Sequence, residues 1–88
     1  RNIIEAVKLK RMGVSAGFPD IEIPLPRGRY HGLYIEMKRQ NGGVLSAKQI
    51  QWHKYLTDNS YKVEVAKGFD HAKQIFTDYL LLGDFYLD

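Results

Sequence analysis

The stretch GFPDIEIPLPRGRYHGLYIEMK, residues 17–38, decides the fold of this chain. Residues 20–25 and residues 33–38 each alternate apolar with polar side chains, which is the period of a β-strand with one buried face. The segment between them is rich in turn residues and is long enough to connect an antiparallel hairpin. Pro24 has no N–H to donate, so the first strand is expected to lie at an edge of the sheet or to end there.

The segments around this hairpin alternate between helix and strand. Residues 2–12 carry apolar side chains at helical spacing with a basic rim. Ser46 is expected to open the next helix, with Gln49 three residues on in the pattern of a capping box. Residues 61–66 alternate as a third strand, and Asp70 can cap a last helix. The chain is therefore predicted to be α/β, a small mixed sheet flanked by helices, with its last strand parallel to the second strand of the hairpin.

The length and composition of the chain limit which class of protein it can belong to. Eighty-eight residues predict one domain, 1–88, and the 44% apolar and 26% charged residues are typical of a soluble globular chain. No run is long enough to span a bilayer, and no cysteine is present for a disulfide or a thiolate zinc site. No signal-peptide pattern opens the chain, so a cytoplasmic location is expected. The net charge of +3 slightly favours a polyanionic partner.

The aromatic and apolar side chains of the two later helices are expected to form the core. A domain this small needs its aromatic residues inside, so they are interpreted as core and not as a base-stacking platform. These residues are Trp52, Tyr55, Leu56, Ala72, Ile75, Phe76, Tyr79 and Leu80. The three histidines, His31, His53 and His71, are not spaced as a metal pair and are interpreted as surface or packing residues.

Three charged residues are expected to converge beside the hairpin. If the two strands pair, Asp20 lies across from the second strand, and Glu36 and Lys38 share one face of it. Two carboxylates can hold a hard cation such as Mg²⁺, with the backbone carbonyl of Met37 as a further ligand. Lys38 beside a metal-activated water would meet the chemical needs of phosphodiester hydrolysis.

The same residues also allow an ordinary structural interpretation. The triplet E-x-K is common by chance, and Pro-Asp at the start of a strand is frequent turn chemistry. A solvated strand face with an ion pair and a metal site both stay open on residue types alone. Gln49 can likewise complete the capping box or point its amide toward a metal-bound water or a phosphate. Seven basic residues are candidates for phosphate contacts: Lys8, Lys10, Arg11, Arg27, Arg29, Arg39 and Lys48.

Three motifs in a fixed order resemble one nuclease family. GFPD (17–20), IEMK (35–38) and GGVLSAKQIQWHKYL (42–56), followed by GFD before the last helix, are similar to the VRR-NUC family of the PD-(D/E)XK nuclease superfamily. The resemblance spans most of the chain and implies a restriction-endonuclease-like fold. It also implies a Mg²⁺- or Mn²⁺-dependent endonuclease that cleaves DNA.

The resemblance assigns roles to individual residues. It makes Asp20 and Glu36 metal-binding carboxylates, and it makes the Met37 carbonyl a metal ligand. Lys38 becomes the catalytic lysine, and Gln49 becomes a glutamine at the edge of the active site. Small stand-alone members of the family, of phage and bacterial type, resemble archaeal Holliday-junction resolvases. This implies branched DNA as the substrate and a homodimer as the active form.

One departure from the family pattern bears on activity. Such domains usually begin with a helix carrying another acidic residue and with a strand, both ahead of the helix predicted at 2–12, and neither is visible here. Glu5 does not match that acidic position and receives no catalytic role. Loss of these elements would predict weak metal binding or low activity. A module that binds nucleic acid without cutting it is therefore the main alternative, and an unrelated interaction domain is a third.

Overall fold

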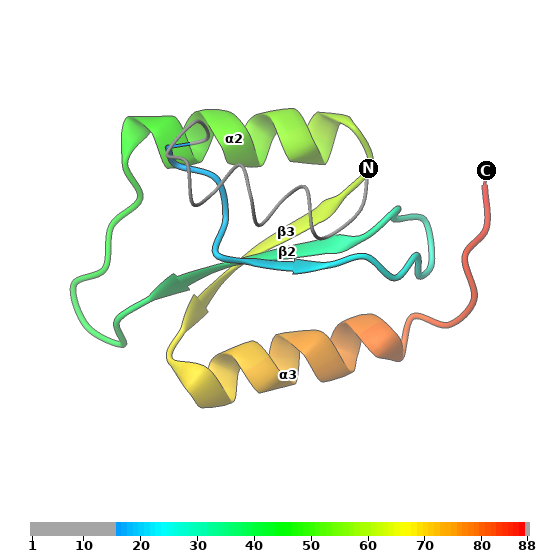
Figure 1. Cartoon of the computed structure of the whole chain (residues 1–88). Coiled ribbons are helices and arrows are strands. Elements are labelled where there is room, and N and C mark those ends of the chain that lie inside the picture. The colour runs from blue at the N-terminus through cyan, green and yellow to red at the C-terminus, as the bar shows by residue number, and fades with distance from the viewer. Residues whose placement is uncertain (1–15, 88) are drawn as a thin grey trace.

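A mixed sheet with a helix on each face forms the part of the chain that the computed structural model describes, residues 16–87 (Figure 1). The helix predicted at 2–12, the basic residues within it and Glu5 lie outside this range. The elements in chain order are β1 (Ile21–Ile23), β2 (Leu33–Lys38), α2 (Ala47–Asp58), β3 (Lys62–Lys67) and α3 (Phe69–Leu80).

The strand order is β1-β2-β3, with β2 in the centre. β1 runs antiparallel to β2 with Ile21 opposite Ile35, and β2 runs parallel to β3 with Lys38 opposite Lys67. The hairpin, the parallel third strand and the mixed α/β class are thus confirmed. β1 is an edge strand that ends before Pro24, in agreement with the missing N–H of proline.

The central strand is buried on both faces, which corrects the prediction of one buried face. Leu33 and Ile35 pack in a core with Ile75 and Tyr79 from α3. Tyr34, on the opposite face, packs with other apolar side chains beneath α2. Alternation indicates which residues share a face, but it cannot show that a second helix will cover the polar face as well.

Two predictions about the helices are also wrong in detail. Tyr55 is 58% exposed, because it lies on the side of α2 that faces away from the sheet. The N-cap of α3 is Gly68, at φ 94°, and Asp70 lies within the first turn. Ser46 does cap α2 in a complete capping box with Gln49, as predicted. Neither described helix is long and apolar enough to cross a membrane.

Candidate active site

α2 lies over the polar face of β2 and meets it in three successive pairs. Residues 49, 53 and 56 follow one another at spacings of four and three, so they form one stripe along the helix. Alternate residues of β2 form the facing row on the strand. From the core toward the end of the strand, Leu56 shares a hydrophobic cluster with Tyr34, His53 contacts Glu36, and Gln49 contacts Lys38. The row thus changes from apolar packing to polar chemistry along its length.

The two predicted carboxylates belong to neighbouring positions across β1 and β2. Continuing the β1–β2 register by one residue beyond the pair of Ile21 and Ile35 places Asp20 opposite Glu36. Oδ2 of Asp20 accepts a hydrogen bond of 2.8 Å from the backbone N–H of Met37, which holds this carboxylate beside β2. Asp20 is exposed and Glu36 is 2% exposed, so one carboxylate faces solvent and the other is enclosed.

The backbone of the GFPD loop explains why proline precedes this aspartate. The N–H and the carbonyl of a strand residue point to the same side, so the Met37 carbonyl also faces β1. The continued register places Pro19 opposite Met37. Pro19 has no N–H, so the β1–β2 ladder cannot supply a donor to the Met37 carbonyl. Within the β1–β2 ladder, that oxygen is therefore left without a donor.

Close packing of the same loop against α2 depends on Gly17. Gly17 has φ +87°, and a Cβ there would lie 2.7 Å from the Cβ of Lys48. The next residue, Phe18, is 6% exposed and makes edge-on contacts with the rings of Tyr34 and Trp52 at 5.3 and 4.9 Å. The loop that presents Asp20 is therefore held between the sheet and the helix.

Gly17→Ala is expected to destabilise the protein by about 2–4 kcal/mol, because it adds left-handed backbone strain to a steric clash with α2. Thermal unfolding followed by circular dichroism measures this. Gly42→Ala is the matched control, since Gly42 also has positive φ (+77°) but a Cβ there would meet nothing within 4 Å. An equal loss of stability in the two variants would show that backbone strain, and not the clash with α2, accounts for the effect at Gly17.

Gln49 completes the predicted capping box and also contacts Lys38. Its Oε1 accepts from the backbone N–H of Ser46 at 2.9 Å, which completes the capping box. The same oxygen accepts from Nζ of Lys38 at 3.0 Å. Both contacts use Oε1 as the acceptor. The helix cap and the site thus share one side chain.

His53 is a site residue that the sequence interpretation missed. Its Nε2 lies 3.3 Å from Oε1 of Glu36. Burial, and then the positive charge of Lys38, hold the pKa of His53 below its ordinary value of 6.5. With the ring proton on Nε2, this contact is a hydrogen bond that Nε2–H donates to the carboxylate. The available signal was the spacing of four from Gln49, which puts both side chains on one face of the helix.

The donor atoms at this position fit a hard divalent cation. Asp20, Glu36 and the Met37 carbonyl offer oxygen atoms, which Mg²⁺ and Mn²⁺ prefer. Within residues 16–87 no three His, Cys, Asp or Glu side chains gather into a metal site. Mg²⁺ is commonly held by one or two carboxylates and keeps several waters, so a set of two carboxylates and one carbonyl suits it better than it suits Zn²⁺.

Comparison with known proteins identifies the family. The model of the VRR-NUC domain matches residues 1–70. The chain belongs to the VRR-NUC family. A solved structure named VRR_NUC domain protein is 43% identical, with a TM-score of 0.81, over 93% of this chain and 67% of that one. A search of curated proteins found no match. The fold and the family are thus those implied by the resemblance, and the VRR-NUC domain is a nuclease-type domain.

The candidate DNA-contacting residues of this VRR-NUC domain divide between the two ends of the sheet. Arg39 directly follows β2 and Lys48 lies in the first turn of α2, so both are at the end that carries Lys38. Arg27 and Arg29 lie in the turn before β2, at the opposite end. Lys67, which was not predicted, is the cross-strand partner of Lys38. The other three candidates, Lys8, Lys10 and Arg11, lie outside the described residues.

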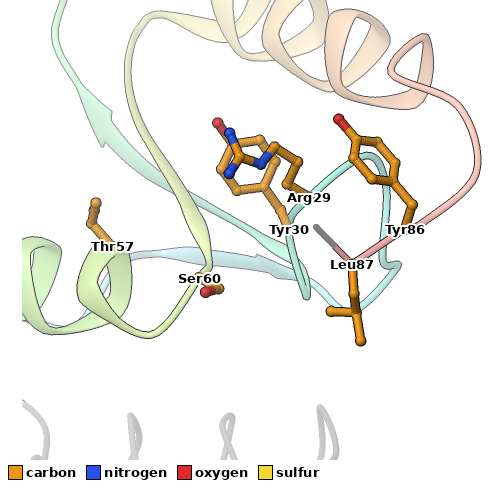
Figure 2. A pocket seen from close by; sticks show the side chains of 6 residues that line it. All are labelled: Arg29, Tyr30, Thr57, Ser60, Tyr86 and Leu87. Carbon is orange, nitrogen blue, oxygen red and sulfur yellow. The ribbon is translucent and has the colours of Figure 1, made fainter.

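A cavity of about 350 Å³ lies at the end of the VRR-NUC domain away from Lys38 (Figure 2). The C-terminal segment closes one side of it, since the backbone N–H of Tyr86 donates to the carbonyl of Gly28 at 2.8 Å. The lining residues are Arg29, Tyr30, Thr57, Ser60, Tyr86 and Leu87. None of them is a predicted metal-binding or catalytic residue, so the cavity is separate from the carboxylates.

Proposed function

We propose that this VRR-NUC domain is a metal-dependent endonuclease that hydrolyses phosphodiester bonds in DNA. The observation that supports it most strongly is the enclosed Glu36 carboxylate, opposite Asp20 and two residues before Lys38 on the same strand. A protein that only binds DNA has no use for two carboxylates beside a surface that must accept phosphate. This argues against the alternative of a non-cleaving nucleic-acid-binding module.

Each oxygen donor of the site has a proposed role in holding Mg²⁺ or Mn²⁺. Asp20 and Glu36 would hold the cation with the Met37 carbonyl, to which the β1–β2 ladder supplies no donor because Pro19 stands opposite it. A cation there offsets the charge of the scissile phosphate and acidifies the attacking water. Asp20 is oriented beforehand, because the Met37 N–H fixes one of its oxygens.

Lys38 supplies a positioned positive charge in the proposed reaction. Its ammonium is held 3.0 Å from Oε1 of Gln49, at the end of β2 where the strand leaves the core. A fixed ammonium can orient the attacking water in line with the scissile bond and offset the charge that develops on the phosphate. Gln49 keeps its Nε2 amide for a phosphate oxygen. Arg39 and Lys48, at the same end of the sheet, would contact flanking phosphates.

Branched DNA is the proposed substrate, and a homodimer is the proposed active form. Both follow from the resemblance of the motifs to stand-alone members of the family. A two-fold axis would relate two copies of the site, so that a dimer could cut two strands of a symmetric junction. Sedimentation equilibrium with and without a four-way junction tests this, and a monomer on the junction would contradict it.

Cleavage of a labelled DNA panel tests the proposed function. The panel holds a four-way junction, a flap, a nicked duplex, a single strand and a plain duplex, each with Mg²⁺, Mn²⁺ or EDTA. We expect cutting of branched DNA that needs the metal and that falls by about 10²–10³-fold in Lys38→Met, because a charge-stabilising group is lost. Lys54→Met, on the exposed side of α2, is the control. Salt-sensitive binding without cutting would instead support the non-cleaving module.

A further inference from the structure

The contact between His53 and Glu36 lies in an enclosed part of the site. Nε2 of His53 and Oε1 of Glu36 are 3.3 Å apart, with side-chain exposures of 15% and 3%. A hydrogen bond is electrostatically stronger in such surroundings than in water. This one reaches from α2 to the central strand, and so it links the helix directly to a residue proposed to hold the cation.

The position of His53 is fixed from both directions along α2. One turn toward the N-terminus, Gln49 is tied to Ser46 by the capping box and to Lys38 by Oε1. Three residues toward the C-terminus, Leu56 is 4% exposed and packs against Tyr34. The imidazole therefore has little freedom to move along or around the helix. Its donor atom is presented to Glu36 by the same packing that holds the helix on the sheet.

The chemical consequence concerns the orientation of the carboxylate. A carboxylate turns easily about its last C–C bond, and a donor on Oε1 restricts that rotation. The carboxylate would then be held in one orientation when a cation binds. Both the neutral imidazole with its proton on Nε2 and the imidazolium provide this donor, so the effect does not depend on the charge of His53. Hydrogen bonds of this kind to metal-ligating groups typically contribute 10–100-fold to metal affinity.

We propose that His53 is a positioning residue that holds the Glu36 carboxylate ready to bind a divalent cation. This inference rests on the proposed function, since it requires that Glu36 binds a metal. It assigns to α2 a role beyond packing and beyond the contact of Gln49 with Lys38. A histidine whose role is only structural would affect stability without changing metal affinity at a given folded fraction.

Calorimetric titration of the folded protein with MnCl₂, in the absence of DNA, tests the inference. His53→Leu keeps apolar bulk but removes the donor, and we expect its Mn²⁺ affinity to fall by about 10–100-fold. His53→Gln places an amide donor near the position of Nε2 and should recover most of that affinity. His53→Asn is too short to reach Glu36 and should resemble the Leu variant. If circular dichroism shows that the Leu variant does not fold, the difference in Mn²⁺ affinity between His53→Gln and His53→Asn tests the inference instead.

Two controls separate failure of this inference from failure of the proposed function. His31→Leu changes a histidine in the turn at the opposite end of β2 and should bind Mn²⁺ like the parent. Parental affinity in the folded Leu and Asn variants, with loss of binding in Glu36→Gln, would overturn the role of His53 and leave the metal site standing. A parent that binds no Mn²⁺ would overturn both.

Discussion

Glu36→Gln is expected to reduce DNA cleavage by about 10³-fold or more while the protein stays folded. The substitution keeps the size of the side chain but removes the charge that we propose holds a divalent cation. A bound cation contributes several kcal/mol to charge stabilisation in hydrolysis, and each 1.4 kcal/mol is about a factor of ten in rate. Single-turnover cleavage of a labelled four-way junction at saturating Mg²⁺ measures the loss.

Stability and DNA binding should respond differently from cleavage in the same variant. Glu36 is 2% exposed and lies 3.3 Å from Nε2 of His53, and an amide oxygen can accept a hydrogen bond from that nitrogen as a carboxylate does. The variant should therefore stay folded. Its affinity for the junction in EDTA should stay close to that of the parent, because phosphate contacts by basic residues carry most of the binding.

Glu64→Gln is the matched control for this experiment. Glu64 is on the neighbouring strand β3, opposite Ile35, and its carboxylate pairs with Lys62 at 2.9 Å. The same chemical change is thus made one strand away, outside the proposed metal site. Cleavage should be nearly unaffected there. Equal rates for Glu36→Gln and the parent would refute the assignment of Glu36.

Tyr34→Ala is expected to destabilise the domain by about 3–5 kcal/mol, the range for removing a buried aromatic side chain. Tyr34 is 1% exposed at the centre of β2, and its ring makes edge-on contacts with Phe18 at 5.3 Å and Tyr61 at 5.4 Å. Small domains have total stabilities of only about 5–15 kcal/mol. The loss should lower the midpoint of thermal unfolding by at least about 12 °C.

Tyr34→Phe separates ring packing from the hydroxyl. The hydroxyl of Tyr34 donates to Oε2 of Glu22 at 3.1 Å, so the Phe variant loses that bond and keeps the ring. Its cost should be about 1–2 kcal/mol. Urea denaturation followed by circular dichroism compares the two variants. If Tyr34→Phe were as unstable as Tyr34→Ala, the hydroxyl and not the packing of the ring would be the main contribution.

Local patterns account for the elements of this fold that sequence reasoning predicted. The alternation of apolar and polar residues identified β2 and β3, and Pro24 correctly predicted where β1 ends. Both signals depend on backbone geometry within a few residues. The capping box of Ser46 and Gln49 is local in the same way. The parallel pairing of β2 and β3 followed from the helix between them, since a strand, a helix and a strand in one sheet require a crossover.

Burial on the polar face of β2 was not predictable from the same patterns. Alternation placed Tyr34 and Glu36 on the face opposite Ile35, but both are as deeply buried as Ile35. Whether a polar row is covered depends on where the next helix packs, which is a contact between distant parts of the chain. The exposure of Tyr55 has the same origin, because the direction in which α2 packs decides which of its aromatic residues reach the sheet.

The sequence by itself determined the helices and strands, their order and the residue types of the site. Asp20, Glu36, Lys38 and Gln49 lie in motifs of fixed order, which local backbone geometry can place on strands and a helix. The tertiary structure decided which of these residues meet. It brings Gln49 into contact with Lys38 and His53 into contact with Glu36. It also separates Arg27 and Arg29 from the carboxylates by the length of β2. The physical reason is that the placement of α2 on the sheet depends on long-range packing in the cluster of Phe18, Tyr34 and Leu56, which no local period encodes.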